Sequence, residues 1–276
     1  MKISGFTIVR NAIKFNYPVV ESIQSILPVC DEFIVNVGKS EDETLKLIQS
    51  IKSDKIRIIE TVWDFAMGKE VLSFETNRAL KECKGDWAFY LQSDELVHED
   101  DLPKIVSAME NNFKNENVDA LRFKWLHFYG SFYRYRIDRG WYQKQDRIIR
   151  NNGQIHSVGD AFGFARKDNL PLRVVPTGAF IYHYGWVNDA ALINARNQNA
   201  QQIGYADNKK DNFSVQGLEK FHPYFGSHPA VMEKIISSHE ISHQDKKNIQ
   251  RQFWWHPGQI FNLRYKTGKR VKESIL

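Results

Sequence analysis

The chain is poor in cysteine and contains no long hydrophobic run. Its 276 residues include only two cysteines, Cys30 and Cys83, too few for a disulfide framework or a four-thiolate zinc site. Such low cysteine usage is typical of a reducing compartment, so we expect a cytoplasmic protein. No apolar run approaches the roughly 18 residues of a membrane helix. The apolar stretch before Arg10 is too short for a secretion signal and predicts a first strand instead.

Linkers and dense basic clusters are also missing. No stretch rich in proline, serine and glycine divides the sequence, which predicts one continuous domain. The net charge is +5, and the excess of basic residues falls after residue 140, where aromatic residues are also frequent. Without a dense Lys/Arg cluster, this half argues against nucleic acid as a partner. It favours a site for an anionic, ring-containing small molecule, or weak contact with an anionic membrane surface.

Strand and helix signals alternate over the first hundred residues. Short apolar runs of strand length are separated by segments with apolar residues at helical spacing. The predicted strands are 3–9, 33–37, 55–59 and 87–91, and the predicted helices are 17–27, 41–51, 69–83 and 100–113. This alternation is typical of an α/β protein whose Rossmann-like, mostly parallel sheet is flanked by helices. Ligands of such sheets bind beyond the carboxyl ends of the strands.

The pattern changes after residue 118. Short aromatic-rich runs are separated by glycine, asparagine and proline, which predicts a mixed part of strands and loops followed by a helical elaboration. The predicted strands are 120–128, 132–137, 145–150, 173–175 and 179–184, and the predicted helices are 189–205 and 230–237. We therefore divide the single domain into two halves, residues 1–118 and 119–276.

The segment GDWAFYLQSDELVHEDDLP, which contains the fourth predicted strand, carries the strongest chemical signal. Asp94 and Glu95 lie just past the apolar strand. A carboxylate at a strand end, beside a nucleotide site, is the ligand that Mg²⁺ or Mn²⁺ needs when it bridges phosphates. The acids at 99–101 begin the next helix, where the helix dipole favours negative charge.

Three stretches resemble the family 2-like glycosyltransferases, which have the GT-A fold. ISGFTIVRN is similar to the opening nucleotide-binding strand, CDEFIVNVGKSEDETLKLI to the second strand with its turn, and YLQSDE to the Asp-x-Asp metal motif. The resemblance implies a nucleoside diphosphate sugar donor, Mg²⁺ or Mn²⁺, inversion at the anomeric carbon, and residues 1–118 as the donor-binding half. The implied donor-binding residues are Thr7, Val9, Asn11, Asp42, Arg78, Gln92, Ser93 and Asp94, and Asp94 is also the implied metal ligand.

Two positions depart from the family pattern. Val37 stands where the family has the aspartate that contacts the nucleobase, and Gln92 stands at the first aspartate of the metal motif. Glutamine is a poorer metal ligand than a carboxylate, although it still hydrogen-bonds a ribose hydroxyl. The nucleobase and the metal requirement therefore stay open.

Inverting transfer needs a carboxylate that deprotonates the attacking hydroxyl. The acids of the first half lie on the leaving-group side, so we expect the base in the later chain. Asp160 is predicted as this base because glycines and aromatic residues flank it in GDAFG, and glycine lets a ligand approach the backbone. Asp146 is the reserve. A turn aspartate that bonds its own backbone is the structural alternative for either residue.

Three kinds of later residue are also candidates. His183 lies in an aromatic strand before Trp186 and resembles the late histidine that binds metal in GT-A proteins; a hydrogen-bonded core histidine is the alternative. The guanidinium groups of Arg147 and Arg150 suit a leaving diphosphate, but strand alternation allows at most one of them to face the site. Trp141 and Trp186 suit either a sugar face or the core.

These observations predict an inverting glycosyltransferase. It would move a sugar from a nucleotide-sugar donor to a hydroxyl of a glycan or lipid-linked acceptor in cell-surface polysaccharide biosynthesis. A nucleotidyltransferase is one alternative, although the segment RNAIKFN lacks the glycine-rich loop which that class needs. A catalytically inactive nucleotide-sugar or glycan-binding module is another, supported by Val37 and Gln92. The aromatic segment 253–257 and the basic segment 266–270 are candidates for contact with a membrane or a partner.

Overall fold

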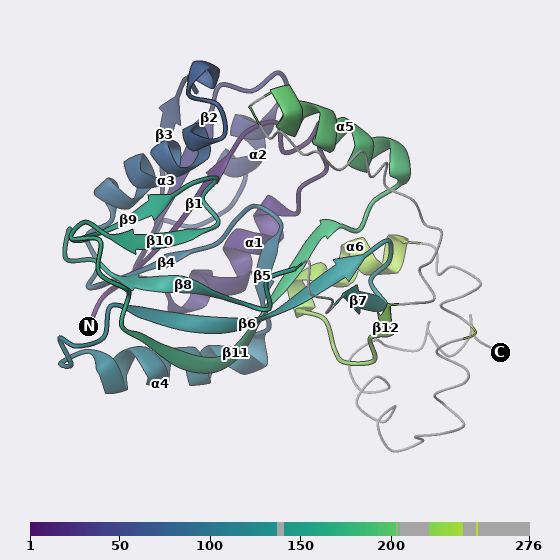
Figure 1. Ribbon diagram of the computed structural model, residues 1–276. Coiled ribbons are helices and arrows are strands. Elements are labelled where there is room, and N and C mark those ends of the chain that lie inside the picture. The colour runs from purple at the N-terminus through teal and green to yellow at the C-terminus, as the bar shows by residue number, and fades with distance from the viewer. Residues whose placement is uncertain (137–140, 203, 205–220, 240–246, 248–276) are drawn as a thin grey trace.

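The computed structural model describes residues 1–136, 141–202, 204, 221–239 and 247. A ten-stranded sheet forms the body of the molecule, with helices on both faces (Figure 1). Its first half contains β1 (Ile3–Val9), β2 (Glu32–Gly38), β3 (Ile56–Thr61) and β4 (Trp87–Tyr90), with α1 (Val19–Ile26), α2 (Thr44–Gln49), α3 (Glu70–Glu82) and α4 (Leu102–Asn112). Within these residues the predicted alternation of strands and helices is confirmed.

The first four strands form the parallel part of the sheet. β1 lies between β2 and β4 and is parallel to both, and β3 is parallel to β2. Every residue of β1 is buried, because a parallel sheet is covered on both faces and its inner strands are therefore almost entirely apolar. The carboxyl ends of β1, β2 and β4 consequently meet at one edge of the sheet.

Two hydrophobic layers cover this sheet. On one face α1, α2 and α4 contribute the apolar side chains Ile23, Ile48 and Ile105 to a single buried cluster. On the other face Leu80 of α3 and Phe164 of a β-hairpin pack against β1 and β4. The sheet is therefore packed between α1, α2 and α4 on one face and α3 with the hairpin on the other.

The second half adds strands of both directions to the same sheet and also forms a separate two-stranded sheet. Its elements are β6 (Ala120–Tyr129), β7 (Arg134–Arg136), β8 (Lys144–Arg150), β9 (Ile155–Val158), β10 (Gly163–Arg166), β11 (Val174–Trp186), α5 (Ala190–Gln202), β12 (His222–Pro223) and α6 (Glu233–Ser238). The short strand β5 (Glu95–Val97) belongs to the first half and pairs antiparallel with β11. β8 lies between β4 and β6 and is antiparallel to both. The sheet is thus continuous across residues 118 and 119, and the GT-A type fold class, with its mixed second half, is confirmed.

The structure differs from the expected second half in three places. The two strands predicted at 173–175 and 179–184 are one strand, β11, with a register shift between Pro176 and Phe180. The hairpin β9–β10 was not predicted, because its residues include a polar, glycine-containing turn without a clear period. The predicted helix at 230–237 begins as a 3-10 turn at Ala230–Met232. The segments 253–257 and 266–270 lie outside the described residues.

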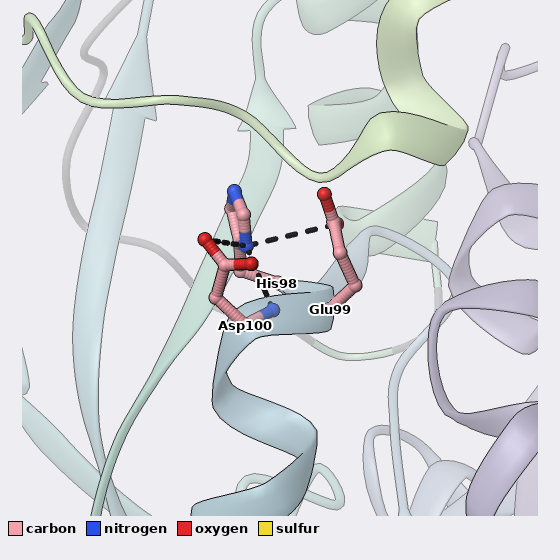
Figure 2. A group of neighbouring side chains, drawn as sticks. All are labelled: His98, Glu99 and Asp100. Atoms are coloured by element: carbon pink, nitrogen blue, oxygen red, sulfur yellow. Dashed lines mark hydrogen bonds and ion pairs between the residues drawn. The ribbon is translucent and has the colours of Figure 1, made fainter. Parts of the chain in front are cut away.

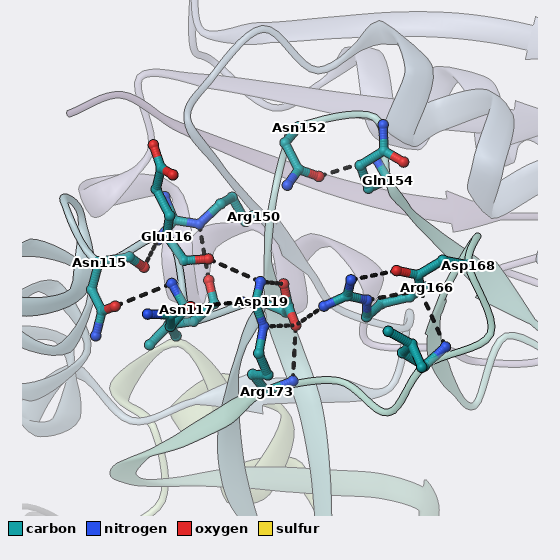
Figure 3. Close-up of polar contacts among 12 residues, drawn as sticks. Asn115, Glu116, Asn117, Asp119, Arg150, Asn152, Gln154, Arg166, Asp168 and Arg173 are labelled. Carbon is teal, nitrogen blue, oxygen red and sulfur yellow. Dashed lines mark hydrogen bonds and ion pairs between the residues drawn. The ribbon is translucent and has the colours of Figure 1, made fainter.

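Asp119 ties the start of β6 to two later segments (Figure 3). Its carboxylate accepts hydrogen bonds from Arg173 Nε at 2.8 Å and Nη2 at 2.7 Å, and from Arg166 Nη1 at 3.1 Å. The hydrogen bonds from Arg173, with those from Arg166, hold the pKa of Asp119 far below its usual range. Charge-assisted bonds of this kind fix the β10–β11 connection against the sheet.

Arg150, one of the two arginines considered for the diphosphate, has a structural position. Its guanidinium donates to the carbonyls of Asn112, Phe113 and Val118, at and beyond the C-terminus of α4. Cations stabilise helix C-termini, because the last carbonyls have no partner within the helix. Arg150 therefore anchors α4 and is not brought to the carboxyl ends of the central strands.

No helix among the described residues is long and apolar enough to cross a bilayer.

Candidate active site

The turn after β4 presents three half-buried polar side chains at the carboxyl edge of the sheet. Ser93 Oγ donates to the carbonyl of Ile8 at the end of β1. The Gln92 amide donates from Nε2 to the carbonyl of Ala161 at 3.2 Å. Asp94 follows them, and its own carbonyl accepts from the backbone N–H of Tyr184 in β11 at 2.8 Å. The turn is therefore held by β1, by the β9–β10 hairpin and by β11 at once.

Asp94 and His183 face one another beyond this turn. The distance from Asp94 Oδ2 to His183 Nε2 is 3.7 Å, and both side chains are largely but not completely buried. Gly185 closes the space beside them: a Cβ on this residue would lie 2.6 Å from Asp94 Oδ2 and 2.8 Å from His183 Nε2. Both predicted metal ligands are thus brought together, and only glycine leaves room for them at position 185.

His127 lies directly behind His183. The two residues are opposite one another in the register of β6 and β11, and their Nδ1 atoms are 3.1 Å apart. The other ring nitrogen of His127, Nε2, is 2.7 Å from the carbonyl oxygen of Tyr142. Burial lowers the pKa of His127 to about 3, and the neighbouring His183 adds to this shift.

Arg147, the second arginine considered for the diphosphate, is fully buried beneath the turn. It binds both carboxylate oxygens of Glu95, from Nε and Nη2, each at 2.8 Å. Nη1 donates to the carbonyl of Phe162 in the hairpin at 2.9 Å. Glu95 in turn accepts the backbone N–H of Gln92. This ion pair therefore shapes the turn and the hairpin, and the guanidinium is engaged with protein acceptors rather than directed to a ligand.

Asp160 lies at the tip of the β9–β10 hairpin and is half-buried. Gly159, with a φ of 60°, and Ala161, with a φ of 61°, turn the chain on either side of it. Ala161 is bonded to Gln92, so the hairpin brings Asp160 next to the turn that carries Asp94.

Asp146, the reserve for the base, is differently placed. It is buried and forms two hydrogen bonds with Arg122 of β6, at 2.8 Å to Nε and 3.0 Å to Nη2. The two residues are register partners in the sheet. Both of its carboxylate oxygens are therefore occupied by the same guanidinium within the sheet. Asp146 is thus paired inside the sheet, and Asp160 stays the predicted base.

The loops after β1 and β2 are fastened to each other by residues predicted to bind the donor. Asn11, in the left-handed region with a φ of 54°, accepts the backbone N–H of Glu41 through Oδ1. Asp42 accepts the N–H groups of Thr44 and Lys14. These contacts bring Asn11 and Asp42 to the same edge as Asp94, and they give both side chains a role in holding the loops.

The remaining predicted donor-binding residues are less exposed or lie on α3. Thr7 and Val9 are buried within β1. Arg78 of α3 is partly exposed and pairs with the buried Glu75 at 3.2 Å. The neighbouring Asn77 exchanges hydrogen bonds with the backbone of Ser157 and so joins α3 to the hairpin. The part that Thr7, Val9 and Arg78 play in donor binding stays a prediction.

A second group of possible metal ligands is formed by His98, Glu99 and Asp100 at the start of α4 (Figure 2). These side chains do not suit a metal ion, because both ring nitrogens of His98 already have hydrogen-bond partners. His98 Nδ1 accepts the backbone N–H of Asp100 at 3.1 Å and caps the helical turn. Its Nε2 lies 2.9 Å from Ser227 Oγ, and Glu99 accepts the backbone N–H of Ala230. This cluster holds the α6 region against α4.

Sequence reasoning missed two residues beside the site. Arg196 of α5 is buried and donates to the carbonyls of Gly185, at 2.5 Å, and of Asn16, at 2.9 Å. The polar helix α5 has no periodic apolar face that would have singled it out. His127 could have been found, since alternation along β6 puts it on the same apolar face as Phe123 and Trp125.

A half-parallel sheet with helices on both faces and an acidic turn after its central strand is the arrangement of the GT-A fold. The sequence model described as Glycosyl transferase family 2 matches residues 6–187. The chain therefore belongs to glycosyl transferase family 2, which confirms the resemblance seen in the sequence and supports a glycosyltransferase over a nucleotidyltransferase. No curated protein sequence matches the chain.

Solved structures with a similar fold are distant in sequence. TarS residues 1–349 from S. aureus in complex with UDP is 16% identical, with a TM-score of 0.46, over 66% of this chain and 60% of that one. Glucosyl-3-phosphoglycerate synthase from Mycobacterium tuberculosis, with Mn²⁺, UDP-glucose and phosphoglyceric acid, is 19% identical, with a TM-score of 0.32, over 45% and 44%. Mannosyl-3-phosphoglycerate synthase from Rubrobacter xylanophilus is 15% identical, with a TM-score of 0.33, over 46% and 41%. The chain spans less than two thirds of each of these proteins.

Proposed function

We propose that this protein is an inverting glycosyltransferase that moves a sugar from a nucleoside diphosphate donor to a hydroxyl acceptor with the help of a divalent cation. The observation that carries the proposal is the Asp94–His183 pair at the carboxyl end of β4, in a chain of glycosyl transferase family 2. The diphosphate of the donor would lie beyond the ends of β1, β2 and β4. The proposed donor-binding residues are Thr7, Val9, Asn11, Asp42, Arg78, Gln92, Ser93 and Asp94.

The donor atoms of the pair fit Mg²⁺ or Mn²⁺. Two ligands that each lie about 2.1 Å from one ion are themselves about 3–4 Å apart, and the two facing atoms of Asp94 and His183 are 3.7 Å apart. Mg²⁺ sites need only one or two protein ligands, because phosphate and water oxygens complete the shell. When bound, the cation supplies Lewis-acid stabilisation of the departing diphosphate. Gln92, which replaces a carboxylate, holds the hairpin instead.

Asp160 is the proposed general base. As the acceptor oxygen attacks the anomeric carbon, the hydroxyl proton passes to the Asp160 carboxylate and the bond to the diphosphate breaks on the opposite face of the sugar. This requires a carboxylate away from the leaving group, and the hairpin carries one next to the turn with Asp94. General bases contribute about 10²–10⁴-fold to the rate.

An aromatic group beside the metal pair supports a carbohydrate acceptor. Trp141 lies 5.3 Å from Trp186 and 4.8 Å from the His127 ring, and Trp186 stacks on Tyr129 at 5.7 Å, all between ring centroids. Partly exposed aromatic faces suit the apolar faces of sugars. We therefore propose a glycan or lipid-linked glycan acceptor, in keeping with a role in cell-surface polysaccharide synthesis and with contact at a membrane surface.

Two substitutions test the proposed chemistry. The protein is assayed for sugar transfer and donor hydrolysis with a panel of nucleoside diphosphate sugars, with Mn²⁺ and with chelator. We expect Asp94→Asn to lose the metal-dependent reaction and its Mn²⁺ affinity. We expect Asp160→Asn to keep nucleotide affinity but to lose about 10²–10⁴-fold in transfer rate.

The matched control is Asp54→Asn, which removes an exposed carboxylate before β3, at the opposite edge of the sheet. It should leave both reactions unchanged. Full wild-type turnover in saturating chelator would overturn the metal role. Transfer by Asp160→Asn at the wild-type rate would remove Asp160 as the base. Nucleotide binding without any turnover would instead identify an inactive binding module.

A further inference from the structure

His127 is not among the residues proposed to contact the substrate, but it is hydrogen-bonded to His183, a proposed metal ligand. It is buried, and its Nδ1 lies 3.1 Å from Nδ1 of His183 on the neighbouring strand. A hydrogen bond between two ring nitrogens needs one protonated nitrogen and one lone pair. Which histidine donates is therefore decided by the second nitrogen of His127.

A backbone carbonyl determines the protonation of that second nitrogen. His127 Nε2 lies 2.7 Å from the carbonyl oxygen of Tyr142, and because a carbonyl only accepts, Nε2 carries a proton. The ring is enclosed by Trp141, Tyr142 and Trp125, at 4.8, 5.0 and 6.0 Å between centroids. An apolar enclosure of this kind favours the neutral imidazole. A neutral ring with its proton on Nε2 has a lone pair on Nδ1, so His183 donates from its own Nδ1.

The remaining nitrogen of His183 is thereby oriented. Nε2 faces Asp94 Oδ2 at 3.7 Å, too far for a hydrogen bond. We infer that His127 is a positioning residue that holds His183 in the Nδ1–H tautomer and directs its Nε2 lone pair at a divalent cation shared with Asp94. The inference rests on the proposed function, since it needs the cation that Asp94 and His183 would hold.

Hydrogen bonds link Tyr142 to His127 and His127 to His183, and this series of bonds should affect metal affinity. A metal-binding imidazole is usually fixed by a hydrogen bond from its other ring nitrogen, and loss of that bond lowers metal affinity about 10–100-fold. Without an acceptor at position 127, the His183 ring is free to turn and to carry its proton on either nitrogen. The acceptor on His127 therefore contributes to metal binding from outside the coordination shell.

The tautomer is measured directly in the unmodified protein. We expect the long-range ¹H–¹⁵N spectrum of the ¹⁵N-histidine-labelled, metal-free chain at pH 8 to show His183 protonated on Nδ1 and unprotonated on Nε2. The same spectrum should show His127 protonated on Nε2. The signals are assigned from the His183→Gln and His127→Asn variants. An Nε2–H tautomer at His183 would overturn the inference.

Affinity for Mn²⁺ is measured in parallel from the electron paramagnetic resonance signal of the free ion. His127→Phe keeps an aromatic ring in the aromatic enclosure but removes the acceptor, and we expect a loss of about 10–100-fold. His127→Asn restores an acceptor close to the position of Nδ1, although it is too short to reach the Tyr142 carbonyl, so it should recover much of that loss. Thermal unfolding of both variants controls for packing.

The outcomes separate the inference from the proposed function. If the wild-type protein binds Mn²⁺ and His127→Phe binds it equally well, the positioning role is overturned while the metal site stands. Equal losses in the Phe and Asn variants, with unchanged stability, would also overturn it. If the wild-type protein does not bind Mn²⁺, the proposed metal site falls, and the role of His127 falls with it.

Discussion

Gly185 is the residue at which the candidate metal site is most sensitive to a single added atom. A Cβ there would lie 2.6 Å from Asp94 Oδ2 and 2.8 Å from His183 Nε2. Its carbonyl is also held by Arg196 at 2.5 Å, which limits how far the backbone can retreat. Glycine is thus required because the two candidate metal ligands lie close to the backbone at this position.

We expect Gly185→Ala to weaken Mn²⁺ binding and to lower the transfer rate by about 10²-fold, the effect of displacing reacting groups by about 1 Å. The fold should survive, because the clash involves side-chain ends. Mn²⁺ titration and steady-state kinetics provide the measurement. Gly163→Ala is the matched control, since a Cβ there makes only an ordinary contact of 3.6 Å with Gln145. Wild-type Mn²⁺ affinity in Gly185→Ala would show that the space between Asp94 and His183 is not used.

The residues of the candidate site differ in how well they can be predicted from the sequence. Asp94 is predictable because it lies just past an apolar strand, and His183 because a family resemblance singles it out. Arg147 illustrates what sequence cannot supply: its partner Glu95 is 52 positions away, and only the pairing of β4 with β8 brings the two together. The same holds for His127 and His183, which are 56 positions apart.

At the scale of elements, periodicity predicts the first half of the fold well. Its parallel strands are buried apolar runs and its helices have one apolar side, so each element has its own local signal. The β9–β10 hairpin lacks such a signal. It is held by contacts from other elements, namely Gln92 to Ala161, Arg147 to Phe162 and Asn77 to Ser157. The element that carries the candidate base is therefore the one that local pattern could not predict.

The ion-pair group at Asp119 gives an element-scale prediction of stability against pH. Asp119 has a folded pKa depressed by Arg173 and Arg166, so its contribution is fully present above its unfolded pKa, about 4, and is lost as the pH falls. We expect Asp119→Asn to lower the free energy of unfolding at pH 7 by roughly 2 kcal/mol, as for buried hydrogen bonds to charged groups. The difference from wild type should shrink progressively below about pH 4.

Urea unfolding at several pH values between 7 and 3 measures this difference. The control is Asp168→Asn, which removes the more exposed carboxylate partner of the same Arg166 guanidinium. Exposed ion pairs contribute little, so its effect should be much smaller at every pH. A gap between wild type and Asp119→Asn that stays constant down to pH 3 would contradict an ionised, bonded Asp119.

At the scale of the whole molecule, the candidate site is assembled where the two halves of the sheet meet. Asp94 comes from the turn after β4, His183 from β11 and Asp160 from the hairpin, while Asn11 and Asp42 hold the loops of the parallel half. β8 pairs with both β4 and β6, so the halves share one hydrogen-bonded sheet. The division at residues 118 and 119 separates proposed roles, donor on one side and acceptor on the other.

A site built from both halves should couple ligand binding to the stability of the whole sheet. A ligand that binds only the folded state at 100 times its dissociation constant adds about 2.7 kcal/mol of stability. For a domain of this size that corresponds to a rise in Tm of about 5–10 °C. We expect a nucleoside diphosphate to raise Tm more in the presence of Mn²⁺ than without it, because the ion is proposed to bridge Asp94, His183 and the phosphates.

Thermal unfolding with UDP, GDP, ADP and TDP, each with and without Mn²⁺, measures this coupling and identifies the nucleobase that the site prefers beside Val37. In Asp94→Asn the additional shift due to Mn²⁺ should disappear, while the smaller shift from the nucleotide alone remains. Nucleoside monophosphates serve as controls, since they lack the second phosphate. If no nucleoside diphosphate stabilises the protein, donor binding at this edge of the sheet is wrong. If the shift is the same with and without Mn²⁺, the nucleotide binds there without the cation, and the metal-assisted mechanism is excluded.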